Sequence, residues 1–168
     1  MADATKWRVA AILVICFTVN LNTVMSSEEL MTKMGVTFFN VLEECKKELK
    51  VTTNINEGLV RFWRQGAAPE RELGCVFLCM AHKKDLLEDQ KRIHHENAHQ
   101  FARGHGAEDD KATEIVSLLR ECEQQFITIT DDCFRALEVA RCFQAHMQRL
   151  QWAPSMEVMV EEILAGMA

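Results

Sequence analysis

Apolar residues recur at steps of three and four along most of the chain, which is the period of an amphipathic helix. One such series is Leu30, Met31, Met34, Phe38, Val41, Leu42 and Cys45, and another is Ile115, Val116, Leu118, Leu119 and Cys122. Alternation typical of a strand is sustained nowhere. The pattern therefore predicts an all-α chain, with helices at about residues 28–48, 54–64, 71–84, 95–103, 109–125, 132–149 and 156–166.

The N-terminus has the pattern of an export signal. Lys6 and Arg8 precede the apolar run from Val9 to Val19, and Val24 and Ser26 provide small side chains for a signal peptidase. A run of about eleven residues is too short to cross a bilayer core, which needs roughly twenty. We expect residues 1–26 to be removed after Ser26, so that residues 27–168 form one secreted, extracellular domain.

Six cysteines remain after the signal, because the seventh, Cys16, leaves with it. They are Cys45, Cys75, Cys79, Cys122, Cys133 and Cys142, with 29, 3, 42, 10 and 8 residues between them. An even set at uneven intervals in an exported chain predicts three disulfides rather than a zinc site.

The predicted helices restrict which cysteines pair. Cys75 and Cys79 lie one turn apart on one helix face, where a mutual bridge would be strained, so each should reach a different helix. Cys133 and Cys142 lie about half a revolution apart and should also have different partners. Spacing alone still leaves fifteen pairings of six cysteines open.

Charge and motif content exclude several function classes. The net charge is −6, and the basic residues are scattered, so no surface for nucleic acid is expected. No G-x-S-x-G, G-x-G-x-x-G or Walker motif occurs, and the cysteines are assigned to bridges. We therefore expect no enzyme, no catalytic residue and no cofactor.

Four segments carry a specific resemblance: FWRQG (62–66), GCVFLC (74–79), IHHENAHQFARGHGA (93–107) and LQWAPSMEV (150–158). Together with the cysteine spacing, they resemble the moth pheromone-binding proteins of the insect odorant-binding family. The resemblance implies six to seven helices around an internal hydrophobic cavity. It also implies the bridges Cys45–Cys79, Cys75–Cys133 and Cys122–Cys142.

The resemblance further implies a carrier that binds a hydrophobic long-chain pheromone or odorant in antennal sensillum lymph. Its partners would be that small semiochemical and an olfactory receptor or neuronal membrane surface, and dimerisation at neutral pH stays open. A general plant-odour or lipid carrier is the alternative. The implied pocket wall comprises Phe38, Phe62, Trp63, Phe77, Ala81, Leu87, Ile93, Val116, Leu119, Val139 and Phe143. From helical spacing alone, such aromatic residues would be ordinary core.

One wall position departs from the resemblance. Several relatives carry a serine whose hydroxyl meets an alcohol ligand, whereas this chain has Ala81, which neither donates nor accepts a hydrogen bond. Arg135 and Thr37 are the candidate replacements. We expect fatty acetates or aldehydes to bind at least as well as the matching alcohol, because an unpaired buried hydroxyl is costly.

The C-terminal residues 155–167 form an amphipathic pattern after Pro154, with Glu157, Glu161 and Glu162 outside its apolar face. In relatives such a tail enters the pocket at acidic pH and displaces ligand. Carboxylates are costly to bury when ionised and less so when protonated, so acid permits insertion.

His94 and His95 match the paired histidines that relatives use near the pocket mouth. Imidazole becomes charged as the pH falls through about 6.5, so a tightly packed neutral pair should open. Two departures predict a shifted or blunted switch: Gly166 stands at a terminal acidic position, and Arg120 replaces a further histidine.

His95, Glu96 and His99 also spell H-E-x-x-H on a predicted helix, with His105 where an extended zincin motif has its third histidine. The three histidines are weak metal candidates, and a zinc metallopeptidase is the alternative from another class. Ala102 stands where that motif needs glycine, and a later Met-turn motif is not recognisable. We therefore disfavour the peptidase.

Overall fold

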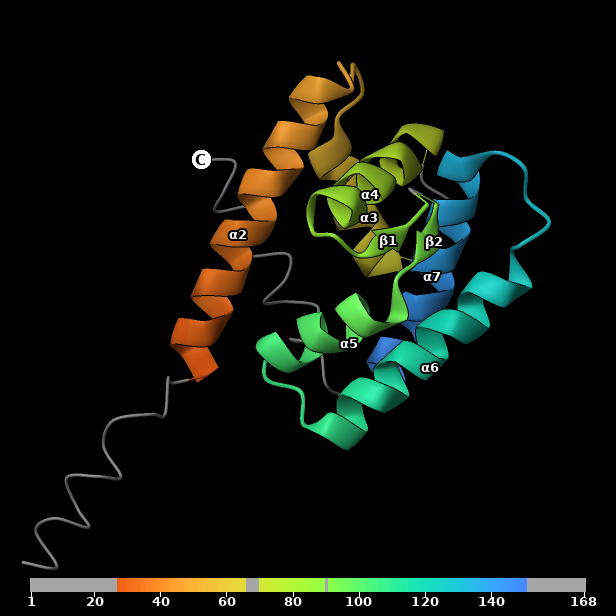
Figure 1. The fold of residues 1–168 in the computed structure, drawn as a ribbon. Helices are drawn as coiled ribbons and strands as arrows, with labels where there is room; N and C mark the ends of the chain where they lie inside the picture. Colours follow the sequence, from red (N-terminus) through yellow and green to blue (C-terminus); the bar gives the residue numbers. More distant parts are fainter. Residues whose placement is uncertain (1–26, 66–69, 90, 151–168) are drawn as a thin grey trace, which may run out of the picture. The chain divides into compact units, whose positions relative to one another are not determined.

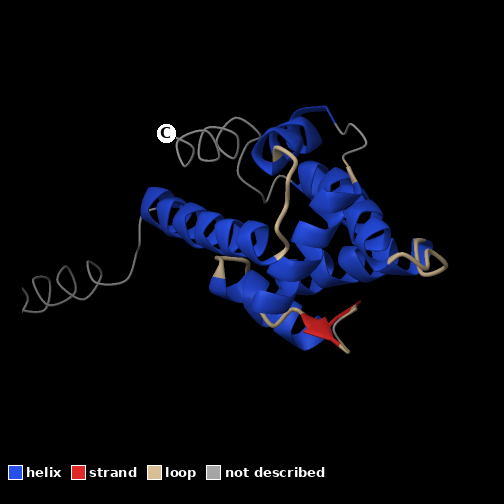
Figure 2. Ribbon diagram, turned by 90° about the horizontal axis from the view of Figure 1, so that it is seen from above, coloured by secondary structure: helices blue, strands red, loops and turns tan. Residues whose placement is uncertain are grey.

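The computed structural model describes residues 27–65, 70–89 and 91–150. The chain divides into a unit of residues 1–32 and a unit of residues 33–168, and the packing below belongs to the second. The described elements are α2 (Ser27–Glu48), α3 (Ile55–Gln65), α4 (Arg71–Lys83), β1 (Leu87–Glu88), β2 (Arg92–Ile93), α5 (His95–Gly104), α6 (Asp109–Gln125) and α7 (Asp132–Leu150) (Figures 1 and 2).

The first six predicted helices are confirmed, with ends within one residue of the expected ones. The signal segment, the helix at 156–166 and the rest of the C-terminal tail lie outside the described residues. None of the helices in the described ranges is long and apolar enough to cross a membrane.

Acidic residues at helix starts explain where two helices begin. Asp109 and Asp110 occupy the first turn of α6, where the helix dipole favours negative charge. Asp131 caps α7, because its Oδ1 accepts the backbone N–H of Phe134 at 2.9 Å. Its Oδ2 accepts a bond from Arg71 Nε at 2.8 Å.

Hydrogen bonds and ion pairs at the start of α7 also lower the pKa values of its two aspartates. The Phe134 N–H and then Arg71 lower the pKa of Asp131, and Lys91 lowers the pKa of Asp132. A lowered pKa means that the two carboxylates stabilise the fold at neutral pH and lose that effect only as the pH falls below their ordinary value of 3.8. The start of α7 therefore stays intact under mild acid.

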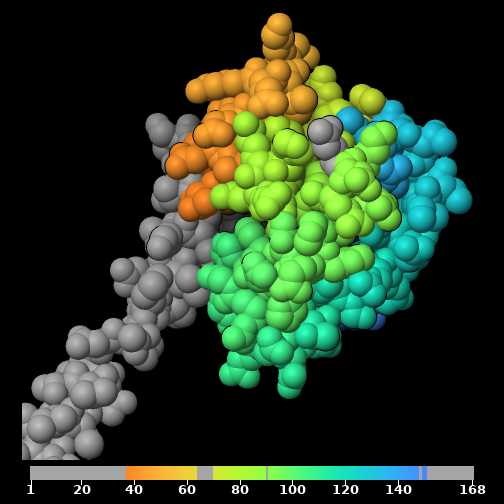
Figure 3. All heavy atoms as spheres, viewed as in Figure 1, coloured from red at the N-terminus to blue at the C-terminus, as the bar shows by residue number. Residues whose placement is uncertain are grey.

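A two-stranded hairpin between α4 and α5 was not predicted. β1 and β2 pair antiparallel, with Leu87 opposite Ile93, and Figure 2 marks them in red. Asp85 and Asp89 adopt left-handed φ angles of 55° and 50°, which aspartate tolerates better than most residues. Two residues per strand are too few for an alternation to be recognised in the sequence. In the space-filling view of Figure 3, the hairpin and α5 lie beside each other on the surface.

The closest helix packing joins α4 to α7 (Figure 1). Gly74 makes this approach possible, because a Cβ atom built on it would lie 1.9 Å from the carbonyl oxygen of Cys133 in α7. The α5 helix packs on α6, and α6 packs on α7.

Three disulfides join the helices in the pairing that the resemblance implied. Cys45–Cys79 links α2 to α4, Cys75–Cys133 links α4 to α7, and Cys122–Cys142 links α6 to α7. The two cysteines of α4 thus reach different helices, and so do the two cysteines of α7, as their angular positions predicted. Native disulfides typically stabilise by roughly 2–4 kcal/mol each.

The buried apolar side chains of the described residues form two separate clusters rather than one core. The first joins residues of α2, α3, α4 and α7 and includes Leu42, Ile55, Leu59, Phe62, Leu73, Val76 and Leu137. The second joins α5, α6 and the end of α7, and it consists of Ala102, Ala107, Ala112, Ile115 and Met147. Since the second cluster is mostly alanine, it fills much less volume than the first.

The α4–α7 contact can be tested at Gly74. Gly74→Ala should destabilise the protein by about 1–3 kcal/mol, because a methyl group must displace the α7 backbone. Chemical denaturation followed by circular dichroism measures the change. Gly58→Ala in α3 is the matched control: no heavy atom lies within 4 Å of the added Cβ, so it should stabilise the helix by roughly 0.5–1 kcal/mol. Equal effects of the two variants would contradict the close approach.

Candidate functional site

Three of the predicted wall aromatics contact one another. Phe62 and Trp63 from α3 meet edge to face with ring centroids 5.5 Å apart, and Phe62 meets Phe77 of α4 in the same way at 5.2 Å. Phe62 is buried, whereas Trp63 and Phe77 are half-buried at the margin of the first cluster. The structure therefore assembles an aromatic group from two helices.

The hairpin brings a second pair together. Leu87 and Ile93 are directly opposite in the antiparallel ladder, so their side chains share one face of the hairpin. The backbone N–H of Ile93 donates to Glu123 Oε1 of α6 at 2.9 Å, which fixes the hairpin to that helix. Glu123 was not among the predicted site residues, since one acidic residue within a helix carries no distinct sequence signal.

Four further wall residues lie on α6 and α7. Val116 and Leu119 share one face of α6, and Val139 and Phe143 share one face of α7, by their three- and four-residue spacing. Cys122 follows Leu119 by one turn of α6, and Cys142 lies between Val139 and Phe143 on α7. The disulfide therefore joins the two helices beside these residues. Val116 and Val139 are each only 9% exposed, yet neither belongs to either cluster formed by the described residues.

The remaining apolar wall candidates are Phe38 and Ala81. Phe38 of α2 packs against the first cluster, and Ala81 is half-buried near the end of α4. Phe143 packs against the second cluster. Most of the predicted wall is thus found at the margin of one cluster or in neither, and only Phe62 lies in the fully buried core.

The two polar candidates differ in their surroundings. Arg135 donates from Nη1 to the carbonyl oxygen of Ile129 at 3.0 Å and from Nη2 to Asp132 Oδ1 at 2.7 Å. It therefore holds the α6–α7 connection against the start of α7. Thr37 lies in α2, and its side chain is exposed.

Gln144 is a structural residue of this site that the sequence did not identify. Its side chain is buried, and Nε2 donates to the carbonyl oxygens of Phe62 and Trp63, each at 3.2 Å. Carbonyls in the last turn of a helix lack partners within the helix, so Gln144 completes the end of α3 from α7. The signal that could have revealed it is a polar residue between Ala140 and Met147 on the apolar stripe of α7.

His94 and His95 begin α5 in two different roles. His94 caps the helix: its Nδ1 accepts the backbone N–H of Asn97 at 3.2 Å. The His95 ring lies against the Arg120 guanidinium, whose Nη2 is 2.9 Å from His95 Nδ1 and whose Nε is 3.3 Å from Nε2. Glu123 Oε2 is 3.9 Å from the same ring. Arg120 is thus in direct contact with His95, the second residue of the histidine pair.

The H-E-x-x-H histidines do not assemble a metal centre among the described residues. His99 Nε2 lies near Thr113 and Asp109, and His105 Nδ1 is bound to the carbonyl oxygen of Phe101 at 2.6 Å. His95 faces the cationic Arg120, which repels a metal ion. The geometry therefore gives the peptidase alternative no support.

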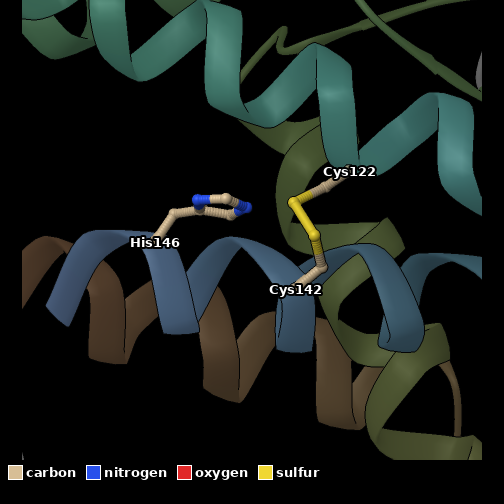
Figure 4. A group of neighbouring side chains, drawn as sticks. All are labelled: Cys122, Cys142 and His146. Carbon is tan, nitrogen blue, oxygen red and sulfur yellow. A yellow bond between two sulfur atoms is a disulfide. The ribbon is translucent and has the colours of Figure 1, made fainter. Parts of the chain in front are cut away.

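One other group has the composition of a metal site. Cys122, Cys142 and His146 place their ligand atoms within 4.8 Å of one another, and Figure 4 shows the His146 ring directed toward the sulfur atoms. The two sulfurs are joined in a disulfide, so neither is available as a thiolate ligand. The group is therefore a packed disulfide with a neighbouring imidazole.

A polar hollow of about 580 Å³ also lies along α6. Ser117, Arg120, Glu121, Gln124 and Gln125 line it, and all five are exposed. This hollow does not suit an aliphatic ligand, because it is open to solvent and does not enclose a guest.

Comparison with known proteins points to one family. The model of the PBP/GOBP family matches residues 27–146. Pheromone-binding protein 2 of Epiphyas postvittana is 38% identical over 153 residues, which cover 90% of this chain and 92% of the relative. General odorant-binding protein 2 of Heliothis virescens is 31% identical over 92% of this chain and 96% of its own. The crystal structure of Epiphyas postvittana Pheromone Binding Protein 3 superimposes with a TM-score of 0.64 and 40% identity, covering 68% of this chain and 98% of that chain.

The role of Gln144 can be tested by Gln144→Met, which keeps the volume but removes both donated bonds. We expect a loss of about 1–3 kcal/mol in the free energy of unfolding, because two buried carbonyls lose their partner. Denaturant unfolding measures it, and Gln100→Met on the exposed face of α5 is the control, with an expected change within about 0.5 kcal/mol. A loss no larger than in the control would show that the α3 end does not depend on Gln144.

Proposed function

We propose, since this chain belongs to the PBP/GOBP family, that it is a secreted carrier of a small hydrophobic pheromone or odorant. It takes up a long-chain aliphatic acetate, aldehyde or alcohol, keeps it out of contact with water in sensillum lymph, and releases it at acidic pH near the receptor membrane. Its site is formed by the aromatic group of α3 and α4, the Leu87–Ile93 pair and the facing surfaces of α6 and α7.

The divided apolar interior is the observation that best supports this proposal. A tightly filled protein core is normally one contiguous cluster. Among the residues that the structure describes, the wall residues Val116 and Val139 are buried but join neither cluster, and Trp63, Phe77 and Phe143 are only half-buried. Apolar side chains arranged in this way gain further contacts when an aliphatic guest is present.

The chemistry of the wall favours an aliphatic ligand. Each methylene group transferred from water to an apolar site contributes about 0.8 kcal/mol, so chain length supplies most of the affinity. The chain contains nine Phe and nine Met and no Tyr, and such side chains offer deformable apolar surface with few hydroxyl groups.

Acid acts on this proposed site through the start of α5. Protonation of His94 Nδ1 removes the acceptor that caps the helix, and it places a positive charge at the positive end of the helix dipole. Protonation of His95 adds a second cation against Arg120, with Glu123 as the neighbouring counter-charge. Both events loosen the α5 start, while protonation of Glu157, Glu161 and Glu162 lowers the cost of inserting the tail.

The proposal is tested by displacement of a fluorescent probe at pH 7 and pH 5. We expect micromolar or tighter binding of long-chain acetates and aldehydes at pH 7 and weaker binding at pH 5. A panel that also includes plant volatiles tests the second candidate, a general odorant carrier, which the general odorant-binding relatives favour. Failure of every long-chain ligand to displace the probe at pH 7 would contradict the carrier function.

The absence of a hydroxyl group at Ala81 predicts which head group of a long-chain ligand is preferred. Ala81→Ser should raise the affinity for a long-chain alcohol by about fivefold or more, because the new hydroxyl pairs with that of the ligand. The affinity for the matching acetate should change less. A competition titration against both ligands measures the ratio. A strong alcohol preference in the unmodified protein that Ala81→Ser leaves unchanged would refute it.

The capping role of His94 predicts how ligand affinity changes between pH 7 and pH 5. His94→Asn keeps a neutral acceptor at the cap that acid does not remove, so the loss of affinity between pH 7 and pH 5 should shrink by about fivefold, equivalent to about 1 kcal/mol of capping. His82→Asn, at an exposed position of α4, is the matched control and should keep the original loss.

Two outcomes would contradict the acid mechanism. One is an affinity that stays flat from pH 7 to pH 5 in the unmodified protein. The other is an unchanged acid release after deletion of residues 156–168, which would remove the tail from the mechanism.

A further inference from the structure

The imidazole of His146 lies beside the disulfide between Cys122 and Cys142. A ring nitrogen and both sulfur atoms lie within 4.8 Å of one another, and Figure 4 shows a nitrogen of the ring directed toward the sulfurs. His146 follows Cys142 by one turn of α7, so the helix itself holds the ring at this place. Among the residues that the structure describes, neither of the other two disulfides has a histidine this close to both sulfurs.

Arg149 determines which nitrogen of His146 carries the proton. Its guanidinium donates from Nη2 to His146 Nδ1. Arginine has no acceptor, so Nδ1 accepts this bond and the ring proton resides on Nε2. In Figure 4 the nitrogen at the far end of the ring, Nε2, is the one directed toward the disulfide. An oriented N–H donor therefore faces the two sulfur atoms.

The two sulfur atoms differ in access. Cys122 is 0% exposed, whereas Cys142 is partly exposed. The rate of thiol–disulfide exchange depends on which sulfur an incoming thiolate reaches and on how readily the other sulfur leaves as a thiolate. Attack therefore occurs at Cys142, and Cys122 is the leaving group. A buried thiolate is costly without a hydrogen-bond donor, and His146 Nε2–H is the donor in place.

The Cys75–Cys133 disulfide is less suited to attack by an anion. Cys133 directly follows Asp131 and Asp132 in the sequence. Hydrogen bonds lower the pKa of both carboxyl groups, so both are ionised and repel an incoming thiolate. Arg71 Nη1 lies 3.6 Å from Cys75 Sγ, but its Nε is bound to Asp131, which offsets its charge.

We propose that Cys142 is a modification site for small soluble thiols of the glutathione class, and that His146 assists the exchange. The thiolate of the small molecule forms a bond to Cys142 Sγ, the Cys122–Cys142 bond breaks, and its electron pair remains on Cys122 as a thiolate. His146 Nε2–H donates a hydrogen bond to that thiolate and keeps its proton. The proton of the attacking thiol has passed to water. A mixed disulfide replaces the original one, so no other oxidant or reductant is needed.

This modification would act on one part of the fold. Cys122–Cys142 is the disulfide that joins α6 to α7, and the apolar cluster between these helices is mostly alanine. The other two disulfides and the first cluster continue to join α2, α4 and α7. Hydrogen exchange of the glutathione adduct should therefore accelerate in α6 more than in α4. Equal acceleration in both helices would contradict this selective loosening.

The site is tested with the full secreted protein and glutathione at pH 8 under native conditions. Samples are quenched with excess N-ethylmaleimide, and peptide mass spectrometry measures how fast each disulfide opens. We expect glutathione on Cys142 and N-ethylmaleimide on Cys122. This disulfide should open roughly tenfold or more faster than the other two, as expected for one hydrogen bond to a developing charge.

Variants of His146 separate its assistance from its packing. His146→Phe keeps a ring but removes the N–H, so the opening of Cys122–Cys142 should become roughly tenfold slower while the other two rates stay unchanged. His146→Gln retains an N–H donor and should recover part of the rate. His82→Phe, at an exposed position of α4, is the matched control and should leave all three rates unchanged.

The direction of the change distinguishes the proposal from a structural effect. If His146 only packed against the disulfide, His146→Phe would loosen the fold and all three disulfides would open faster. That result would overturn the proposal, as would equal opening rates in the unmodified protein or glutathione found on Cys122. The mapping in the unmodified protein tests the site even if a variant does not fold. Ligand takes no part in the experiment, so its outcome is independent of the carrier function.

Discussion

The contact between α4 and α7 is the constraint on which the rest of the structure depends. Gly74 lets the two helix backbones meet, and the adjacent Cys75 joins Cys133 at the same place. From this contact Cys79 reaches α2, and Cys142 on α7 reaches α6. Cross-links of this kind hold the helices by covalent bonds, so the apolar interior need not be completely filled to keep the fold. The division of the buried residues into two clusters is consistent with this arrangement.

Two polar residues on the disulfide-linked helices α6 and α7 position parts of the proposed site. Gln144 of α7 completes the end of α3 and thereby positions Trp63, and Glu123 of α6 holds the hairpin that leads into the histidine pair. The polar residues that stabilise the fold by binding backbone groups therefore also position the residues of the proposed ligand site. The carboxylates at the start of α7 have lowered pKa values, so they keep their charge in mild acid, whereas the start of α5 is capped by the imidazole of His94. The proposed acid response therefore involves the start of α5 and not the start of α7.

Much of the fold was predictable because it depends on local patterns. Helical periodicity located six helices, and angular positions excluded the Cys75–Cys79 and Cys133–Cys142 bridges. The hairpin was missed because two-residue strands show no alternation. Gln144 and the Arg120–His95 contact were missed because each joins residues that are distant along the chain, where no periodicity relates them.

The central claim is that an aliphatic ligand binds among the wall residues inside the helical frame. Isotope-filtered nuclear Overhauser spectra of ¹³C-labelled protein with unlabelled tetradecyl acetate test it directly, because the effect reports only protons within about 5 Å of the ligand. The account predicts contacts from the ligand to Trp63, Phe77, Leu119 and Phe143. Contacts confined to exposed apolar residues such as Ile127 and Phe134 would contradict it.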